Sequence, residues 1–144
     1  MHHIGFFLYP GHQILDFAGP FGAFEAVARI ADRPLYALEV LSRAGGKVRG
    51  SGGAMVESRA PKGVALDTLI VVGGDIAPMR APGEVAAVRA LAAKAARVAS
   101  VCTGRSCWRR RGCWRGAGRR PIGGSRICCS GNTRLSGSRP IASS

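Results

Sequence analysis

The sequence predicts an α/β fold in which a parallel sheet carries helices on both faces. Short apolar runs alternate along the chain with segments whose apolar residues recur at helical spacing. The main runs are continuously apolar, which is typical of strands buried on both faces of a parallel sheet. Two of them end directly in glycine turns, which mark the strand boundaries. In such a fold, ligands bind at the carboxyl ends of the strands.

Four apolar runs are predicted to be the strands of this sheet, at residues 4–9, 36–42, 69–72 and 98–101. Pro10-Gly11 closes the first run and Gly73-Gly74 closes the third, so these glycines lie at the carboxyl edge of the sheet. A glycine-rich, basic loop or hairpin tip is expected over residues 44–53. A short strand is expected at residues 54–59.

Two segments show helical spacing of their apolar residues. The first covers residues 20–30, with Pro20 suited to the first turn of a helix. If this helix begins near Gly19, Asp16 could be its N-cap, which is the alternative to the role in a site that is described below. The second helix is expected over residues 82–96, and Asp75 is expected to serve turn formation rather than catalysis.

The segment Arg97 to Gly104, RVASVCTG, places a cysteine at the tip of a buried strand. A β-branched run leads to Cys102, and Thr103-Gly104 follows at once. This pattern predicts a sharp strand–turn–helix elbow with a nucleophile at its tip, similar to that of α/β hydrolases but with sulfur in place of oxygen. The alternative is a structural thiol in the core, where free cysteine is common.

Charge is distributed unevenly along the chain. Residues 1–104 hold eleven basic and eight acidic residues, whereas residues 105–144 hold ten arginines and no acidic residue. The net charge of +13 therefore comes mostly from the tail. A surface for nucleic acid or for an anionic membrane is not implied for the first 104 residues.

Cysteine usage and hydropathy suggest a cytoplasmic protein. Cys102 is the only cysteine in the first 104 residues, which argues against a disulfide framework. No run is long enough to span a membrane and no signal peptide is recognisable. We expect no metal or cofactor, because His2, His3 and His12 have no converging partners and are predicted to be surface residues. The spacing of the four tail cysteines does not fit a zinc site.

Three segments resemble one known superfamily. They are FFLYPGHQILDFAGPFGAFEAV, LDTLIVVGGD and RVASVCTG, in that order along the chain. They are similar to the ThiJ/PfpI superfamily, whose members are related to class I glutamine amidotransferases. Within the superfamily, these motifs most resemble those of the N-terminal amidase-like domain of AraC-type transcription regulators. Isonitrile hydratases are similar over the same motifs. The resemblance covers residues 2–104 and implies a flavodoxin-like sheet, truncated here after the strand that leads to the cysteine.

The resemblance implies the members of a site. Cys102 matches the nucleophile position and Asp16 matches the acidic partner of that sulfur. Thr103, Gly73 and Gly74 would offer backbone N–H groups to a developing oxyanion. The histidine typical of the superfamily follows the cysteine by about twenty residues, but no histidine follows Cys102 here.

The function implied is ligand sensing by one domain of an AraC-type regulator. A small nitrogenous or carbonyl metabolite would bind near Cys102, the intact parent would form a homodimer, and a helix-turn-helix domain missing from this chain would bind DNA. The alternative is a cysteine-dependent enzyme of the isonitrile hydratase type, inactive in this form because the histidine is absent. A third possibility is redox or carbonyl-stress sensing through the oxidisable thiol of Cys102.

Composition changes abruptly after Gly104. Residues 105–144 are rich in Arg, Gly, Ser and Cys, without periodicity, and are predicted to be disordered. Our hypothesis is that they are translated out of frame. Cys-Trp is encoded TGY-TGG, and reading one base earlier turns this into a leucine codon at both Cys107-Trp108 and Cys113-Trp114. In the restored frame the tail can be back-translated into an apolar helix, a histidine, a second helix and a strand.

Overall fold

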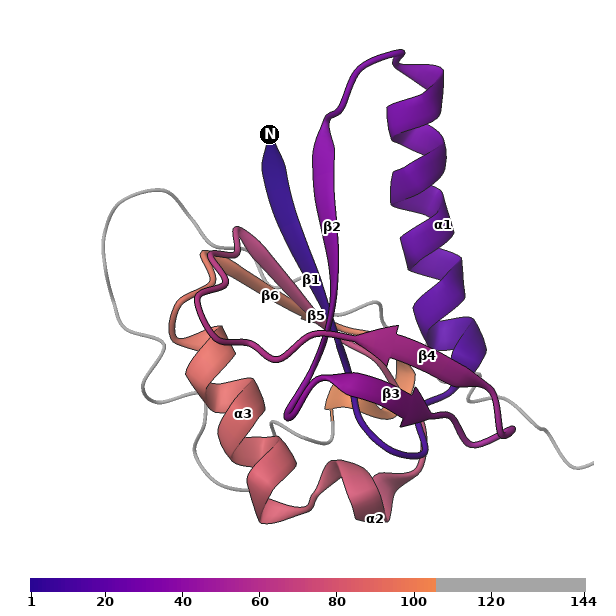
Figure 1. The fold of residues 1–144 in the computed structure, drawn as a ribbon, viewed down its shortest axis with the longest axis vertical. Coiled ribbons are helices and arrows are strands. Elements are labelled where there is room, and N and C mark those ends of the chain that lie inside the picture. Colours follow the sequence, from indigo (N-terminus) through magenta and orange to yellow (C-terminus); the bar gives the residue numbers. More distant parts are fainter. Residues whose placement is uncertain (106–144) are drawn as a thin grey trace, which may run out of the picture.

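A four-stranded parallel sheet forms the centre of the molecule, in the order β2-β1-β5-β6 (Figure 1). The computed structural model describes residues 1–105. The strands of the sheet are β1 (His2–Leu8), β2 (Tyr36–Ser42), β5 (Thr68–Val71) and β6 (Arg97–Ser100). A separate antiparallel hairpin consists of β3 (Gly46–Arg49) and β4 (Met55–Ser58). The helices are α1 (Ile14–Ile30), α2 (Ile76–Met79) and α3 (Pro82–Ala92), and a 3-10 turn η1 (Cys102–Arg105) follows β6.

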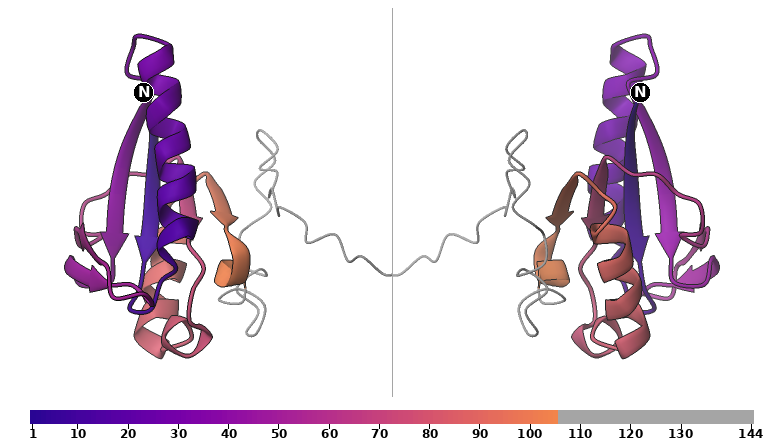
Figure 2. Two further views of the ribbon diagram at one scale, coloured as in Figure 1. Left: turned by 90° about the vertical axis from the view of Figure 1, so that its right-hand side faces the viewer. Right: turned by 90° about the vertical axis from the view of Figure 1, so that its left-hand side faces the viewer.

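Helices cover both faces of the sheet, as predicted (Figure 2). Alternate residues of a strand point to opposite faces, so neighbouring apolar residues supply two cores. Ile4, Phe6 and Ile70 pack with the aromatic residues of α1. Phe7, Leu69 and Val71 belong to the core on the other face, together with Val88 and Leu91 of α3. This double burial explains why the sequence of these strands is continuously apolar.

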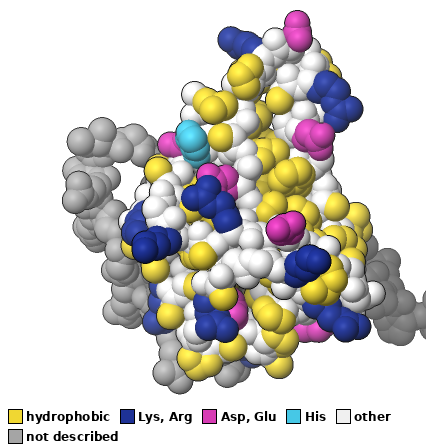
Figure 3. Space-filling view, viewed as in Figure 1, with side chains coloured by type: hydrophobic (Ala, Val, Ile, Leu, Met, Phe, Trp, Pro, Cys, Tyr) yellow, Lys and Arg dark blue, Asp and Glu magenta, His cyan; other side chains and the backbone are white. Residues whose placement is uncertain are grey.

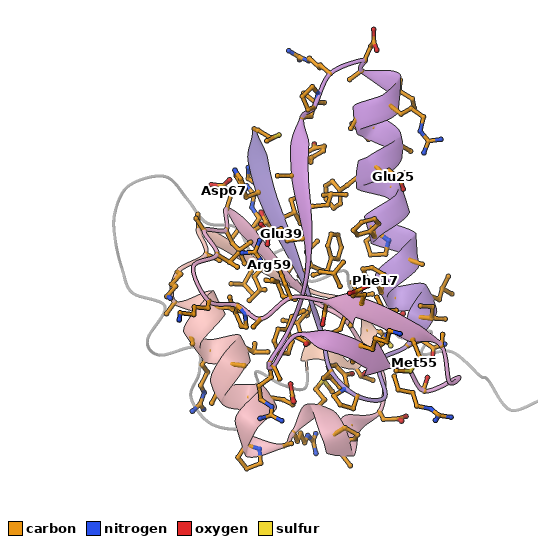
Figure 4. All side chains as sticks on the ribbon, viewed as in Figure 1. Phe17, Glu25, Glu39, Met55, Arg59 and Asp67 are labelled. Carbon is orange, nitrogen blue, oxygen red and sulfur yellow. The ribbon has the colours of Figure 1, made fainter. Side chains whose placement is uncertain are left out.

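Helix α1 begins at Ile14, six residues before the predicted start, and Pro20 lies inside it. The expectation that Pro20 marks the first turn is therefore wrong. A proline within a helix removes one backbone hydrogen bond and costs about 3 kcal/mol. Aromatic packing offsets this cost, because the rings of Phe17, Phe21 and Phe24 surround Phe6 with centroid distances of 5.9, 5.4 and 6.3 Å. Figure 4 shows Phe17 projecting from α1 toward the sheet.

The hairpin β3–β4 corrects part of a second prediction. Residues 50–53 of the glycine-rich segment 44–53 form a hairpin turn, as one of the two alternatives had it, but Gly46–Arg49 form a strand, β3. The expected strand at 54–59 is its partner β4. The end of β4 is fixed to β2, because Arg59 N–H donates to Val40 O at 2.9 Å and Ser42 N–H donates to Arg59 O at 3.1 Å. An ion pair of 3.0 Å between Arg59 Nη1 and Glu39 Oε2 supports the same junction (Figure 4). The turn at the other end of the hairpin lies at the carboxyl edge of the sheet, against His12.

The second half of the described chain follows the prediction closely. Helix α3 begins at Pro82 as expected and ends at Ala92, four residues early. Asp75 precedes the short helix α2, which the sequence did not predict, and its side chain makes no capping hydrogen bond there. The predicted disorder of residues 106–144 lies outside the described residues, and within residues 1–105 no helix is long and apolar enough to cross a membrane.

Candidate functional site

Cys102 lies at a sharp turn directly after β6. Val101 N–H still donates to Val71 O at 3.0 Å, so the strand remains paired with its neighbour up to this point. Cys102 then adopts a φ of +50°, a left-handed conformation that is uncommon for residues other than glycine. Gly104 N–H donates to Val101 O at 2.9 Å and closes the turn. This sharp turn, called the elbow below, leaves the Cys102 side chain exposed. The role of Cys102 as a nucleophile at its tip stays a prediction.

Gly73 forms the surface against which the site residues pack. A Cβ atom built on Gly73 would contact Asp16 Oδ2, and it would lie 2.9 Å from Cys102 Cβ and 3.1 Å from Thr103 N. Residues from α1, from the end of β5 and from the elbow therefore converge on one α-carbon. Only a residue without a side chain permits this approach. The structure thus brings Cys102, Asp16, Thr103 and Gly73 together, as the resemblance implied, while their chemical roles remain predictions.

Asp16 contributes a carboxylate oxygen without a partner. The residue belongs to the first turn of α1, so the alternative role as an N-cap near Gly19 is wrong. Its N–H donates to Gln13 O at 3.1 Å, which fixes the backbone. Asp16 Oδ2 is buried and has no hydrogen-bond partner among the described residues. Buried carboxylate oxygens are normally hydrogen bonded, so this atom is available to a proton or to a ligand at the elbow.

Thr103 and Gly74 join the elbow to the turn after β5. Gly74 N–H donates to Thr103 Oγ1 at 3.0 Å, and the same hydroxyl donates to Gly74 O at 3.0 Å. Gly74 was predicted to offer its N–H to an oxyanion, but here that N–H already has a partner. Within residues 1–105, the predicted donors with no such side-chain partner are the N–H groups of Gly73 and Thr103.

His12 is buried, contrary to the prediction that all three histidines lie on the surface. Its side chain has 0% exposure, and its Nδ1 lies 3.1 Å from Tyr9 O. Burial lowers the pKa of His12, and the hydrogen bond to Tyr9 O opposes this shift. The sequence signal that could have found it is its position in the Pro-Gly-His turn that ends a buried strand, where the hairpin covers it. His2 and His3 belong to β1, at the opposite end of the strand from the elbow.

Charge and possible metal ligands are dispersed over the described part of the molecule. Lys and Arg side chains are scattered over the face shown in Figure 3 and form no continuous patch there. Among residues 1–105, no group of three or more His, Cys, Asp or Glu residues is arranged to hold a metal ion.

Comparison with known proteins places the chain in a family. No protein-family model matches it. It is 42% identical over 108 residues to an uncharacterized protein in the cpoL 5' region of Streptomyces lividans, and the match covers 72% of this chain and 74% of that protein. The chain belongs to the family of this Streptomyces protein.

Solved structures show the fold of this family. A ThiJ/PfpI family protein from Pseudomonas syringae matches with a TM-score of 0.63 at 20% identity, over 74% of this chain and 44% of that one. An AraC family transcriptional regulator from Pseudomonas putida matches with a TM-score of 0.61 at 18% identity, over 78% of this chain and 71% of that one. The predicted ThiJ/PfpI fold is thereby confirmed. The chain spans less than half the length of the Pseudomonas syringae protein.

Proposed function

We propose that residues 1–104 are the ligand-sensing domain of an AraC-type transcription regulator. The observation that carries this proposal is the pairing of an exposed thiol, Cys102, with a buried oxygen of Asp16 across Gly73, an oxygen that no described residue hydrogen bonds. Such a site offers a small ligand both a soft nucleophile and a hydrogen-bond acceptor. The likeness in fold to the Pseudomonas putida regulator supports the same assignment.

The histidines of residues 1–105 favour sensing over catalysis. His2 Nε2 lies 2.9 Å from Thr68 Oγ1, and His12 Nδ1 lies 3.1 Å from Tyr9 O. Within this part of the chain, no histidine hydrogen bonds to Cys102. A thiol without an imidazole base can bind or add to an electrophile, but it lacks the usual route for repeated proton transfer. The ligand we propose is a small nitrogenous or carbonyl compound held near Cys102.

DNA binding and dimerisation are assigned to the intact parent protein. The described sheet and helices contain no helix-turn-helix pair, because α1, α2 and α3 are separated by strands or are a single turn long. A helix-turn-helix domain encoded beyond this chain would contact DNA, and a homodimer would match the two half-sites of an operator.

A second candidate function is hydration of isonitriles. Asp16 Oδ2, which has no hydrogen-bond partner among the described residues, favours it, because that carboxylate could take the proton of the Cys102 thiol and pass it to the isonitrile carbon as the sulfur adds there. Water would then add to the resulting thioimidate carbon, and the formamide would leave as the thiol is restored. This candidate requires turnover, whereas the sensing domain requires binding alone.

Ligand titration of the full chain separates the two candidates. Small isonitriles and aldehydes are added to the wild type, to Cys102→Ala and to Asp16→Asn, and the thermal midpoint and the release of a formamide are measured. The sensing domain predicts a shift of the midpoint that both variants reduce, without formamide. Cys107→Ala serves as the matched cysteine control and should behave as the wild type. Formamide production that Cys102→Ala abolishes would replace sensing by catalysis, and a midpoint shift that Cys102→Ala retains would exclude both.

A further inference from the structure

His12 is a buried titratable group that the proposed site does not use. The carbonyl oxygen of Tyr9 can only accept, so the proton of the neutral ring belongs to Nδ1, which donates to Tyr9 O at 3.1 Å. The other nitrogen, Nε2, then carries a lone pair. It is buried, and the described residues provide it with no hydrogen-bond partner. The neutral ring can be buried in this way. A second proton, on Nε2, would find no hydrogen-bond acceptor among the described residues, so the charged ring is disfavoured.

The hairpin β3–β4 covers this ring. Gly11 N–H donates to Arg49 O at 2.8 Å, and Ser51 N–H donates to His12 O at 2.9 Å. Ser51 Oγ also donates to Gln13 Oε1 at 2.9 Å. A Cβ atom built on Gly50 would lie 3.4 Å from His12 Nε2, so the backbone of the hairpin turn lies directly over the lone pair.

The opposite side of the same segment supports the elbow. Gln13 N–H donates to Gly73 O at 2.9 Å, and Asp75 N–H donates to Gly11 O at 2.9 Å. His12 also forms an isolated bridge with Gly74. Residues 11–13 therefore hold the hairpin on one side and the glycine turn next to Cys102 on the other.

We propose that His12 is an acid-sensitive switch: protonation of its Nε2 releases the hairpin β3–β4 from the carboxyl edge and loosens the Gly73-Gly74 turn beside Cys102. A second ring proton converts Nε2 into a charged donor that faces covering backbone. Opening the hairpin exposes this donor to water. The switch does not depend on which ligand binds at Cys102.

Among the described residues, no neighbouring group hydrogen bonds to Nε2 in the closed arrangement. The titratable or charged residues on the surrounding elements are Tyr9 after β1, Asp16 of α1, Arg49 of β3 and Asp75 before α2. Within the described chain, none of them hydrogen bonds to Nε2. The Asp75 carboxylate lies over Gly11, where a built Cβ would be 2.8 Å from Asp75 Oδ2. The lowered pKa of His12 agrees with this arrangement.

The hairpin is suited to local opening. Val48 is its one fully buried hydrophobic side chain among the described residues, and Val56 is half-buried. Segments with few buried apolar contacts open at low free energy. The far end remains attached to β2 through Arg59, so the turn at Gly50 and Ser51 can separate without unfolding the sheet.

The sign and size of the effect follow from proton linkage. The ordinary pKa of histidine is 6.5, and the closed state holds His12 below it. The open state therefore binds more protons as the pH falls below 6.5, and opening becomes more favourable. With an open-state pKa at the ordinary value, the opening equilibrium rises by at most about tenfold between about pH 7.5 and about pH 5.5.

Hydrogen exchange of the full chain, followed by mass spectrometry and corrected for intrinsic exchange rates, tests the proposal. Backbone amides of residues 46–58 and 72–75 should gain in opening as the pH falls over this range, by up to about tenfold. His12→Gln should remove the gain, because glutamine cannot take up a proton. His3→Gln is the matched control and should retain it.

Several outcomes would overturn the switch. One is that opening of the hairpin in the wild type does not vary with pH. Another is that the increase in opening at low pH persists in His12→Gln. A gain confined to the hairpin, with residues 72–75 unchanged, would overturn the coupling to the elbow. If His12→Gln does not fold, an NMR titration of the wild-type imidazoles decides: the pKa of His12 must lie below the ordinary histidine value of 6.5, and a pKa at or above that value would contradict the proposal.

Discussion

The hydroxyl of Thr103 and the backbone of Gly74 form a reciprocal pair of hydrogen bonds, each 3.0 Å long. Through this pair, the turn after β5 positions the elbow after β6 in space. Neither residue belongs to the parallel sheet, so the pair extends the connection between β5 and β6 beyond the last strand hydrogen bonds. The site at Cys102 therefore depends on contacts between two loops as well as on the sheet itself.

Replacing Thr103 by valine tests this connection. Thr103→Val keeps the shape of the side chain and removes both hydrogen bonds, each worth about 0.5–1.5 kcal/mol. We expect the free energy of unfolding, measured by urea denaturation, to fall by about 1–3 kcal/mol. Thr103→Ser keeps the hydroxyl and should lose much less. A loss in Thr103→Val no larger than that in Thr103→Ser would contradict the contribution of the two hydrogen bonds.

Gly73→Ala should disrupt the site more directly. The new Cβ would meet Asp16 Oδ2 and would lie 2.9 Å from Cys102 Cβ, within the turn that both elements share. Overpacking of this kind costs about 1–3 kcal/mol in the free energy of unfolding. We also expect the rate at which Cys102 is alkylated, measured by peptide mass spectrometry, to change.

Gly22→Ala is the control for this substitution. Gly22 lies within α1, and a Cβ built there has no atom within 4 Å. Alanine at this helical position should stabilise the protein by about 0.5–1 kcal/mol. If Gly73→Ala changed the free energy of unfolding no more unfavourably than Gly22→Ala, the close packing of Asp16 and Cys102 against Gly73 would be incorrect.

The sequence predicted the sheet well because burial on both faces leaves a simple pattern. The strand at residues 36–42 has the predicted bounds, and the other three strands differ by one or two residues at their ends. Cys102 was placed at the elbow from its position between an apolar run and Thr103-Gly104. The proximity of Asp16 to Cys102 was implied by the resemblance alone, because 86 positions separate them in the chain.

The remaining features depend on contacts that a local pattern does not contain. Pro20 indicates a helix start in isolation, but the packing of aromatic rings around Phe6 allows the helix to begin earlier. The strand β3 has four residues with one buried side chain, Val48, and forms because β4 pairs with it. His12 is buried because a hairpin nearly forty residues later in the chain covers it.

Asp67 gives a prediction at acidic pH. Its carboxylate accepts a hydrogen bond of 2.8 Å from His3 N–H, and this bond, ahead of the charge of His2, lowers the pKa of Asp67 below its ordinary value of 3.8. Because the folded-state pKa is lowered, the stabilisation is present above pH 3.8 and is lost as the pH falls through the folded-state value.

Urea midpoints recorded across this acidic range should therefore approach each other in the wild type and in Asp67→Asn as the pH falls. Asp32→Asn is the control, since no described residue donates a side-chain hydrogen bond to that exposed carboxylate, and its difference from the wild type should vary less with pH. A constant difference between the wild type and Asp67→Asn would contradict the assignment.

The change of composition after Gly104 leads to a prediction at the level of the gene. Gly104 is buried, and a Cβ built there would lie 3.0 Å from Val72 O, so the chain leaves the elbow tightly packed against the end of β5. An elbow of this kind is normally followed by a helix that covers it. Residues 105–116, RSCWRRRGCWRG, have no apolar face of useful width, whereas the alternative frame places leucines at both Cys-Trp pairs.

We therefore expect independent sequencing of the locus to show that a one-base shift near codon 105 restores an apolar helix and a histidine within about twenty-five codons. In that frame, a helix-turn-helix region further on would support the regulator, and a stop codon about ninety residues on would support the enzyme. Codons for the two Cys-Trp pairs that are confirmed in the present frame, with no apolar segment in the alternative one, would exclude the shift and leave the arginine-rich tail as a genuine part of the protein.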